Sequence, residues 1–349
     1  MARVIPVALG ERSYDVWVGR GVRGRLGDVL PVRARRAAIV SQAPIADAWP
    51  LDTGLEQRTF LIGDGESNKS LETVGGLCEG FAGFALTRDD VVIGLGGGLV
   101  TDVAGFAAAV FHRGVPVVHV STSLIGQVDA AIGGKTGVNL DRGKNLVGAF
   151  WQPLAVLCDT ETLTTLSAAE YRSGLGEVAK YHFLADNPDV AMDPAHPIEE
   201  RVARCVALKA HVVAGDERES TTPPAGARSR AILNYGHTLG HALESAGSYG
   251  IRHGEAVAVG LAFAARLAHR VGRISAERVS DHDEVLRAYG LDARLPAAAS
   301  VEQLMSFMSR DKKAVRGLTF VLDSARGVEV VHDLDPALVR ETLTEMETA

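Results

Sequence analysis

Four short runs rich in β-branched residues recur along the first 160 residues, and they alternate with segments whose apolar residues have helical spacing. The runs are RRAAIVS (35–41), DDVVIGLGG (89–97), VPVVHVST (115–122) and LAVLCDT (154–160). Such alternation is typical of an α/β domain with a largely parallel sheet. The first 19 residues also alternate apolar and polar side chains as a strand does, and they lack the apolar core and cleavage site of a signal peptide.

Strand signals nearly vanish from about residue 167 onward. The stretches 167–184, 198–217 and 253–272 have helical spacing of their apolar residues and no strong strand pattern. Proline-rich loops are expected at 185–197 and 221–227. We therefore predict an α/β domain over residues 1–166 and a mainly α-helical domain over residues 167–349.

The composition bounds the class of partner. A net charge of -7 argues against a nucleic-acid or acidic-membrane surface. The longest apolar runs, 103–111 and 256–265, are far shorter than the roughly 20 residues of a membrane span. Cys78, Cys158 and Cys205 form no CxxC pair, which favours a reducing compartment. We expect a cytoplasmic protein whose partner is a small molecule, with no nucleic acid and no membrane.

Three polar, glycine-rich stretches in the first half are candidates for phosphate binding. GLGGGLVTD (94–102) follows a strand and precedes an apolar helix, so it fits either a pyrophosphate or close packing of helix and sheet. GDGESNKSLE (63–72) by itself reads as a capped helix start. Residues 127–153 combine Asp129, Lys135, Lys144 and Asn145 with several glycines. This stretch favours binding of a phosphate and hydroxyls, with a solvated loop as the alternative.

The second half carries a candidate metal site. In RAILNYGHTLGHALE (230–244), Arg230, Asn234, His237 and His241 recur at intervals of four, three and four, which predicts one polar stripe on a helix. Neutral imidazoles and a carboxylate suit zinc, and three protein ligands leave a position for substrate. We predict Glu177, His237 and His253 as the ligands. The alternative is that the histidines are satisfied separately in a helical core.

These residues lie in motifs that resemble the 3-dehydroquinate synthase family of sugar-phosphate cyclases. The matching stretches occur in the family's order from residue 63 to 313: DGESNK, GGGLVTDVAGF, RGVPVVHVSTSLIGQVDAAIGGKTGVN, GKNLVGAFWQP, GLGEVAKY, LNYGHTLGHALE, HGEAV and RDKK. The resemblance implies an NAD-binding α/β domain, a helical domain that holds a divalent metal (Zn²⁺ or Co²⁺), a sugar-phosphate substrate and a homodimer. It also implies transient oxidation of a ring hydroxyl, loss of phosphate, reduction, ring opening and an aldol closure.

The resemblance assigns roles residue by residue. The positions expected to contact the nucleotide are Asp64, Glu66, Lys69, Gly97, Gly98, Asp102, Thr122, Ser123, Thr162 and Thr165, and Lys144 is expected beside both nucleotide and substrate. The metal ligands match Glu177, His237 and His253. The substrate positions are Asp129, Lys135, Asn145, Lys180, Lys209, Arg230, Asn234, His241, Lys312 and Lys313. Arg113 matches a position that reaches across the dimer.

The branch within the family is open between two substrates. GGKTGVN and GKNLVGAF resemble the dehydroquinate type more than the valiolone or deoxyinosose cyclases, and Arg230 with Lys209 favours a carboxylated substrate. ERSYDV, FHRG, AFWQP, LCDTETLTTL and KYHFL are similar to aminodehydroquinate synthases of aminohydroxybenzoate antibiotic pathways, which we favour slightly over the ordinary shikimate enzyme. The sequence is also compatible with a valiolone-type cyclase, a metal-dependent polyol dehydrogenase or a noncatalytic NAD-binding regulatory protein.

Overall fold

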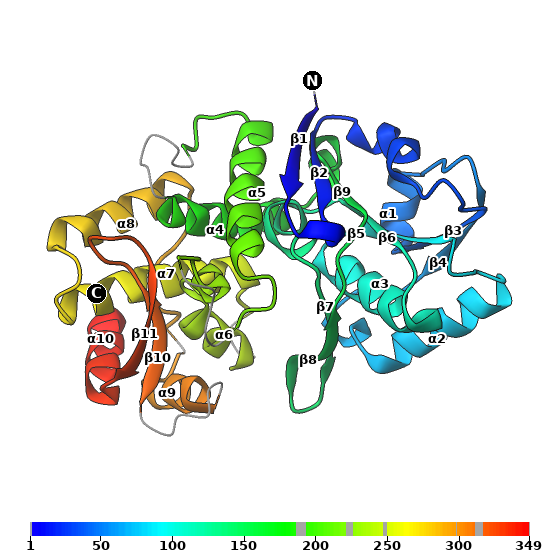
Figure 1. Cartoon of the computed structure of the whole chain (residues 1–349). Coiled ribbons are helices and arrows are strands. Elements are labelled where there is room, and N and C mark those ends of the chain that lie inside the picture. The colour runs from blue at the N-terminus through cyan, green and yellow to red at the C-terminus, as the bar shows by residue number, and fades with distance from the viewer. Residues whose placement is uncertain are drawn as a thin grey trace. The chain divides into compact units, whose positions relative to one another are not determined.

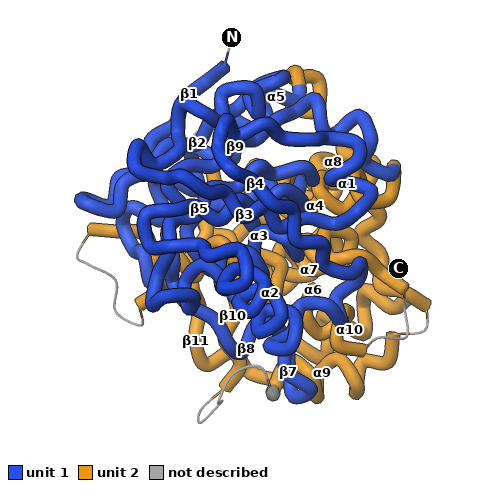
Figure 2. Tube along the Cα trace, turned by 90° about the vertical axis from the view of Figure 1, so that its right-hand side faces the viewer, with its two compact units in different colours: residues 1–167, 198–218 blue, residues 168–197, 219–349 orange. Residues whose placement is uncertain are grey.

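The computed structural model of the chain describes residues 2–185, 193–220, 226–246, 250–297, 299–310 and 317–348. Its contacts divide the chain into two compact units (Figure 2). Unit 1 consists of residues 1–167 and 198–218, and unit 2 consists of residues 168–197 and 219–349. Within the described ranges, no helix combines the length and the apolar character that crossing a bilayer demands.

Unit 1 is built on a seven-stranded sheet whose strand order is β1-β2-β9-β6-β5-β3-β4 (Figure 1). All neighbouring strands pair in parallel except β1 and β2, which are antiparallel. The strands are β1 (Arg3–Val7), β2 (Tyr14–Gly19), β3 (Arg36–Ser41), β4 (Glu56–Leu61), β5 (Val91–Gly96), β6 (Val117–Ser121) and β9 (Ala155–Asp159). Each predicted β-branched run forms one strand of this sheet.

Apolar residues cover both faces of the sheet, as the unbroken apolar runs of its central strands require. On one face, Val92 and Val117 pack against α2 (Leu71–Gly83) and α3 (Gly98–Val110). On the other face, Ile93 and Val120 pack against the 3-10 segment Val22–Val29. The short helix α1 (Ala43–Ala48) follows β3, and an antiparallel hairpin of β7 (Lys135–Leu140) and β8 (Gly143–Phe150) precedes β9.

Helix α5 (Ile198–Gly215) belongs to unit 1, although the sequence placed it in the helical domain. It contacts β1, β2 and the π-helical turn Gly126–Ala130. Its buried residues, which include Val202 and Val206, cover apolar surface of that unit. Helical periodicity predicted the element but not which core its apolar face would join.

Unit 2 is mainly helical. Its helices are α4 (Ala168–Leu184), α6 (His237–Ser245), α7 (His253–Arg270), α8 (Ala276–Ala288), α9 (Val301–Arg310) and α10 (Pro336–Thr348). The almost wholly buried α7 contacts α4, α6, α8 and α10. One antiparallel hairpin, β10 (Leu318–Leu322) with β11 (Glu329–Leu334), was not predicted. The ring centroid of Phe320 on β10 lies 5.7 Å from that of Phe263 on α7. The fold therefore matches the expected combination of an α/β unit and a mostly helical unit.

Candidate metal centre and nucleotide-binding elements

Two close backbone contacts in unit 2 bring the predicted metal ligands together. A Cβ on Gly176 would lie 2.0 Å from the carbonyl oxygen of Gly254, and one on Gly254 would lie 1.6 Å from that of Ser173. Helices α4 and α7 therefore cross backbone against backbone at this point. Glu177 follows Gly176 and His253 precedes Gly254, so the crossing itself places both side chains.

A similar contact positions His237. Gly236 immediately precedes α6 with a left-handed φ of 78°, and a Cβ on Gly260 of α7 would lie 1.8 Å from the Gly236 carbonyl oxygen. Only glycine tolerates both conditions at these positions. His237, the first residue of α6, is consequently held against α7, the helix that begins with His253.

The three predicted ligands meet at one carboxylate oxygen. Glu177 Oε1 lies 3.0 Å from His253 Nε2 and 3.3 Å from His237 Nε2. The ligand atoms of these three residues all lie within 4.8 Å of one another, and Glu177 is fully buried. Side chains from α4, α6 and α7 thus converge although they are far apart in sequence.

The contacts of the Nδ1 atoms of His237 and His253 show which ring nitrogens face Glu177. His237 Nδ1 lies 3.1 Å from the Tyr235 carbonyl oxygen, and His253 Nδ1 lies 3.0 Å from Glu244 Oε2. Both partners can only accept, so each Nδ1 carries the proton. Both Nε2 atoms face the Glu177 carboxylate, so a ring whose only proton is on Nδ1 offers its Nε2 lone pair to a cation bound there. Two nitrogens and one oxygen arranged in this way can hold a shared cation, and the set suits a divalent metal such as zinc.

The charges around Glu177 keep it ionised. Burial opposes ionisation, but the ammonium of Lys180 and the His237 imidazole, with hydrogen bonds from both histidines, hold the pKa of Glu177 well below its usual value. Lys180 Nζ lies 2.5 Å from Glu177 Oε2 and is itself buried. Burial favours neutral His253, yet its bonds to Glu177 and Glu244 raise its pKa to about 10. A bound cation would take the place of that second proton.

The predicted polar stripe of residues 230–241 is not one helix, which corrects the sequence interpretation. Arg230–Asn234 forms a 3-10 segment, and Gly236 reverses the chain before α6 begins. The buried Arg230 and the half-buried Asn234, which donates to Glu219 Oε1 at 3.1 Å, therefore lie outside α6. Only His241 shares α6 with His237, and their ring centroids are 5.3 Å apart. The glycine that causes the break was visible in the sequence.

In unit 1 the glycine-rich loop between β5 and α3 leaves little room for a side chain at Gly97 or Gly98. A Cβ on Gly97 would lie 2.9 Å from Ser123 Oγ, and one on Gly98 would lie 3.2 Å from the Ala130 Cβ. Gly98 begins α3, so its amide belongs to a helix N-terminus that favours anions. Thr122 donates its backbone N–H to the Gly96 carbonyl at 3.0 Å. The loop is thus a backbone cradle suited to a dinucleotide's pyrophosphate.

The other predicted nucleotide residues of unit 1 lie in three small networks. Lys69 pairs with Asp102 of α3, and burial raises the pKa of Asp102 despite this pairing. The side chain of Asp64 accepts from Gln42 and from the Gly65 amide. The Thr162 hydroxyl donates to the Asp159 carbonyl, and the Thr165 hydroxyl accepts from Trp49 Nε1 and donates to the Thr162 carbonyl.

The β7–β8 hairpin carries three exposed predicted residues, Lys135, Lys144 and Asn145. Asn145 has a left-handed φ of 56° and donates its amide N–H to Asn139 Oδ1 at 2.8 Å. Asn139 also donates its side-chain N–H to Glu66 Oε1, and its backbone N–H to the Lys69 carbonyl. This link between the 63–72 loop and the hairpin was not predicted from the sequence because its residues are far apart in the chain.

Lys209, on α5, pairs with Asp129 inside unit 1. Its ammonium lies 3.0 Å from Asp129 Oδ1 and donates to the Asp129 carbonyl at 2.7 Å. The exposed Arg113 has a left-handed φ of 66°, next to His112 at 50°. Lys312 and Lys313 lie outside the described residues.

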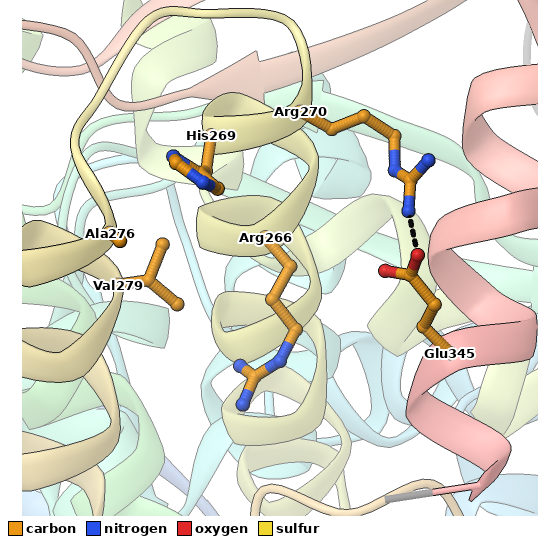
Figure 3. Close-up of a pocket in the computed structure, with 6 residues that line it drawn as sticks. All are labelled: Arg266, His269, Arg270, Ala276, Val279 and Glu345. Carbon is orange, nitrogen blue, oxygen red and sulfur yellow. Dashed lines mark hydrogen bonds and ion pairs between the residues drawn. The ribbon is translucent and has the colours of Figure 1, made fainter.

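A surface cavity of unit 2 is lined by residues that do not belong to the metal cluster. It has a volume of about 400 Å³ and is lined by Arg266, His269, Arg270, Ala276, Val279 and Glu345 (Figure 3). Its two arginines already have carboxylate partners, since Arg266 pairs with Asp283 and Arg270 with Glu341 and Glu345. Nothing in this lining resembles the metal cluster.

Comparisons with known proteins show the family to which the sequence is similar. Residues 59–173 match the 3-dehydroquinate synthase N-terminal family, and residues 174–314 match the 3-dehydroquinate synthase C-terminal family. A relative from Amycolatopsis mediterranei, named "Putative aminodehydroquinate synthase", is 53% identical over 99% of this chain and 95% of that protein. A 3-dehydroquinate synthase from Nitrobacter winogradskyi is 43% identical over 97% of this chain and 94% of that protein.

Solved structures of cyclases have the same fold. A 2-deoxy-scyllo-inosose synthase complexed with carbaglucose-6-phosphate, NAD⁺ and Co²⁺ has a TM-score of 0.85 at 25% identity, over 99% of both chains. The 2-epi-5-epi-valiolone synthase of Streptomyces hygroscopicus, with NAD⁺ and Zn²⁺ bound, has a TM-score of 0.84 at 25% identity, over 98% of both chains. The matches along both parts of the sequence and the two near full-length relatives show that this chain belongs to the 3-dehydroquinate synthase family.

Proposed function

We propose that the protein is an NAD- and metal-dependent cyclase that eliminates phosphate from a 3-deoxy-heptulosonate 7-phosphate and closes a carbocycle, with the amino analogue as its preferred substrate. The observation that carries the cyclase assignment is the convergence of Glu177, His237 and His253, with both Nε2 atoms directed at one carboxylate oxygen. The 53% identity to the relative named for aminodehydroquinate, against 43% to a 3-dehydroquinate synthase, supports the amino substrate.

The cofactors fit the residues that are present. The backbone cradle at Gly97 and Gly98 would hold the NAD pyrophosphate, and the pair of Lys69 with Asp102 reaches α3, the helix that begins at this cradle. Glu177, His237 and His253 would hold the divalent metal. When bound, NAD supplies reversible hydride transfer and the metal supplies Lewis-acid polarisation of the hydroxyl that is oxidised.

The remaining residues would bind and orient the substrate. In unit 1, the ammonium groups of Lys135 and Lys144 suit the phosphate, and the Asn145 amide suits a hydroxyl. In unit 2, the buried guanidinium of Arg230 suits a carboxylate, which a bidentate contact would orient. His241, exposed beside His237, is placed to exchange a proton with a substrate hydroxyl. Lys180 keeps Glu177 in its anionic, metal-binding form.

A direct assay tests this proposal. Purified protein, NAD and Zn²⁺ or Co²⁺ are incubated with 3-deoxy-arabino-heptulosonate 7-phosphate or its amino analogue, and phosphate and NADH are both measured. We expect phosphate release without net NADH, faster with the amino compound. Faster turnover of the oxygen compound would make the protein an ordinary 3-dehydroquinate synthase. Net NADH would indicate a polyol dehydrogenase instead.

Variants sharpen the assay. Lys135→Ala should raise the KM for the phosphorylated substrate about tenfold or more, because a charge-assisted hydrogen bond to phosphate is lost. Arg294→Ala is the matched control, since Arg294 forms an exposed pair with its neighbour Asp292. If wild-type protein turns over neither compound, a valiolone-type cyclase or a noncatalytic protein becomes the better assignment.

A further inference from the structure

Glu244 of unit 2 lies beside the predicted metal ligands but has no role in the proposed chemistry. It lies on α6, seven residues after His237 and three after His241, so all three side chains share one face of the helix. Its side chain is only 12% exposed. Glu244 was not among the residues predicted from the sequence, although this helical spacing contained the signal.

Glu244 contacts the outer nitrogen of a predicted metal ligand. The His253 ring lies between two carboxylates, with Nε2 at 3.0 Å from Glu177 Oε1 and Nδ1 at 3.0 Å from Glu244 Oε2. Both carboxylates can only accept, so when a cation takes the place of the Nε2 proton beside Glu177, the proton that remains is on Nδ1 and is donated to Glu244. The contact also fixes the ring's rotation about its side-chain bonds.

We propose that Glu244 is a positioning residue, which holds His253 in the tautomer and orientation that direct Nε2 at the metal. This inference rests on the proposed metal site. Carboxylate, histidine and metal in series raise the basicity of the ligand and pre-orient it, and loss of such an outer partner typically costs 10–100-fold in metal affinity.

The two histidines differ in how they are held. His237 donates its Nδ1 proton to the backbone carbonyl of Tyr235, which no side-chain substitution removes. His253 depends on a side chain and begins α7, where the ring is about one-third exposed. Glu244 is therefore the outer contact whose removal can be tested without changing a ligand.

A competing role for Glu244 is direct coordination of a second cation. Glu244, His241 and His253 also lie close enough together to hold an ion. That arrangement would require His253 Nδ1 to lose its proton while Nε2 serves the first site, so one ring would bridge two cations. Metal stoichiometry separates this role from the positioning role.

The test measures Co²⁺ binding to metal-free full-length protein, by visible absorption and by competition with a chelator, with no substrate present. We expect wild type to bind one Co²⁺ per chain and Glu244→Ala to bind it 10–100-fold more weakly, with a changed d–d spectrum. Glu244→Gln, whose amide oxygen can still accept the Nδ1 proton, should recover much of the affinity. Glu341→Gln, an exposed glutamate paired with Arg270, is the control and should bind as wild type does.

A double-mutant cycle shows whether Glu244 acts through His253. In a His253→Ala background, Glu244→Ala should weaken Co²⁺ binding no further. Additive losses, or a stoichiometry that falls from two ions to one, would overturn the positioning role. Equal affinity of wild type and Glu244→Ala would overturn it as well while leaving the proposed function intact. If wild-type protein binds no Co²⁺ at all, the proposed metal-dependent function fails.

Discussion

The metal cluster of unit 2 and the nucleotide-binding elements of unit 1 are built in different ways. In unit 2, buried side chains from regular helices meet at Glu177, and glycine contacts between helix backbones set their separation. In unit 1, the candidate groups are backbone amides of the glycine loop and exposed side chains of a hairpin, held by long-range hydrogen bonds such as that of Asn139 to Glu66.

This difference teaches where each part should be sensitive to change. A buried carboxylate among three positively polarised partners cannot be replaced without leaving a charge unpaired. An exposed hairpin residue can be replaced at the cost of a hydrogen bond. We therefore expect substitutions in the cluster to affect chemistry and stability strongly, and substitutions in the hairpin to affect affinity modestly.

The largest expected effect is that of Glu177→Gln in the cluster. Loss of the anionic ligand should remove most of the bound metal after dialysis and lower turnover about 10³-fold or more, because metal polarisation supplies several kcal/mol. Metal analysis and phosphate release measure the two quantities. His237→Ala is the companion variant, and circular dichroism checks that both proteins fold. Full metal content and normal turnover in the Glu177→Gln variant would show that the cluster is not the metal centre.

Gly254→Ala tests the backbone contact that brings α4 to α7. The new Cβ would lie 1.6 Å from the Ser173 carbonyl oxygen, and backbone cannot move aside as a side chain can. We expect a loss of about 3 kcal/mol in the free energy of unfolding, measured by denaturant titration. Gly75→Ala in α2, where a Cβ meets nothing within 4 Å, is the control and should not destabilise the protein. Equal stability of both variants would contradict the close crossing.

Asp90→Ala probes how unit 1 holds its strands. The buried Asp90 carboxylate accepts from the backbone N–H groups of Arg35, Arg36 and Thr87 and from the Thr87 hydroxyl, and its removal should cost about 2 kcal/mol. Burial opposes ionisation, but these hydrogen bonds lower the pKa of Asp90. Its contribution is therefore present above the unfolded-state pKa and is lost as the pH falls through the folded-state value.

The pH dependence of that variant provides the measurement. Denaturant midpoints of wild type and Asp90→Ala should approach each other as the pH is lowered from about 5 to about 2, which lies below the ordinary aspartate pKa. A difference in stability that stays constant over this range would show that the charge on Asp90 contributes nothing.

The smallest effect should come from Asn139→Ala in the hairpin. The variant loses the side-chain contacts with Glu66 and Asn145 but keeps its backbone bond to Lys69. Since exposed hydrogen bonds contribute about 1 kcal/mol, we expect roughly fivefold weaker NAD binding by calorimetry. Asp141→Ala at the exposed turn of the same hairpin is the control. A loss as large as that of Glu177→Gln would erase the contrast between the two regions.

Local pattern predicted the central strands of the sheet and several of the described helices because burial imposes a period on the sequence. The runs at 35–41 and 89–97 became β3 and β5, and the apolar run at 256–265 lies in α7. Local pattern could not assign α5 to unit 1, since that depends on a distant partner surface. It also missed the β10–β11 hairpin, whose short strands gain their burial from contacts with α7.

The sequence likewise predicted part of the candidate site but not all of its local structure. Residue type and spacing, and then motif resemblance, named the three residues that meet at Glu177 Oε1, but neither showed that Gly236 separates Arg230 and Asn234 from α6. The pairing of Lys209 with Asp129 joins residues 80 positions apart and has no local signature. The role proposed for Glu244 required the direction of a ring nitrogen, which only coordinates provide.

The contact of Gly176 with Gly254 has a consequence for metal selection. Because main chain touches main chain, the glycine contact sets the backbone spacing between Glu177 and His253, which are 76 positions apart in sequence. The backbone positions from which both side chains reach the cation are therefore set when the polypeptide folds, before any ion is bound. Ions of different radius would differ in their distances to these ligands while the backbone stays in place. Exchanging one ion for another should therefore alter the catalytic rate more than it alters the protein's conformation.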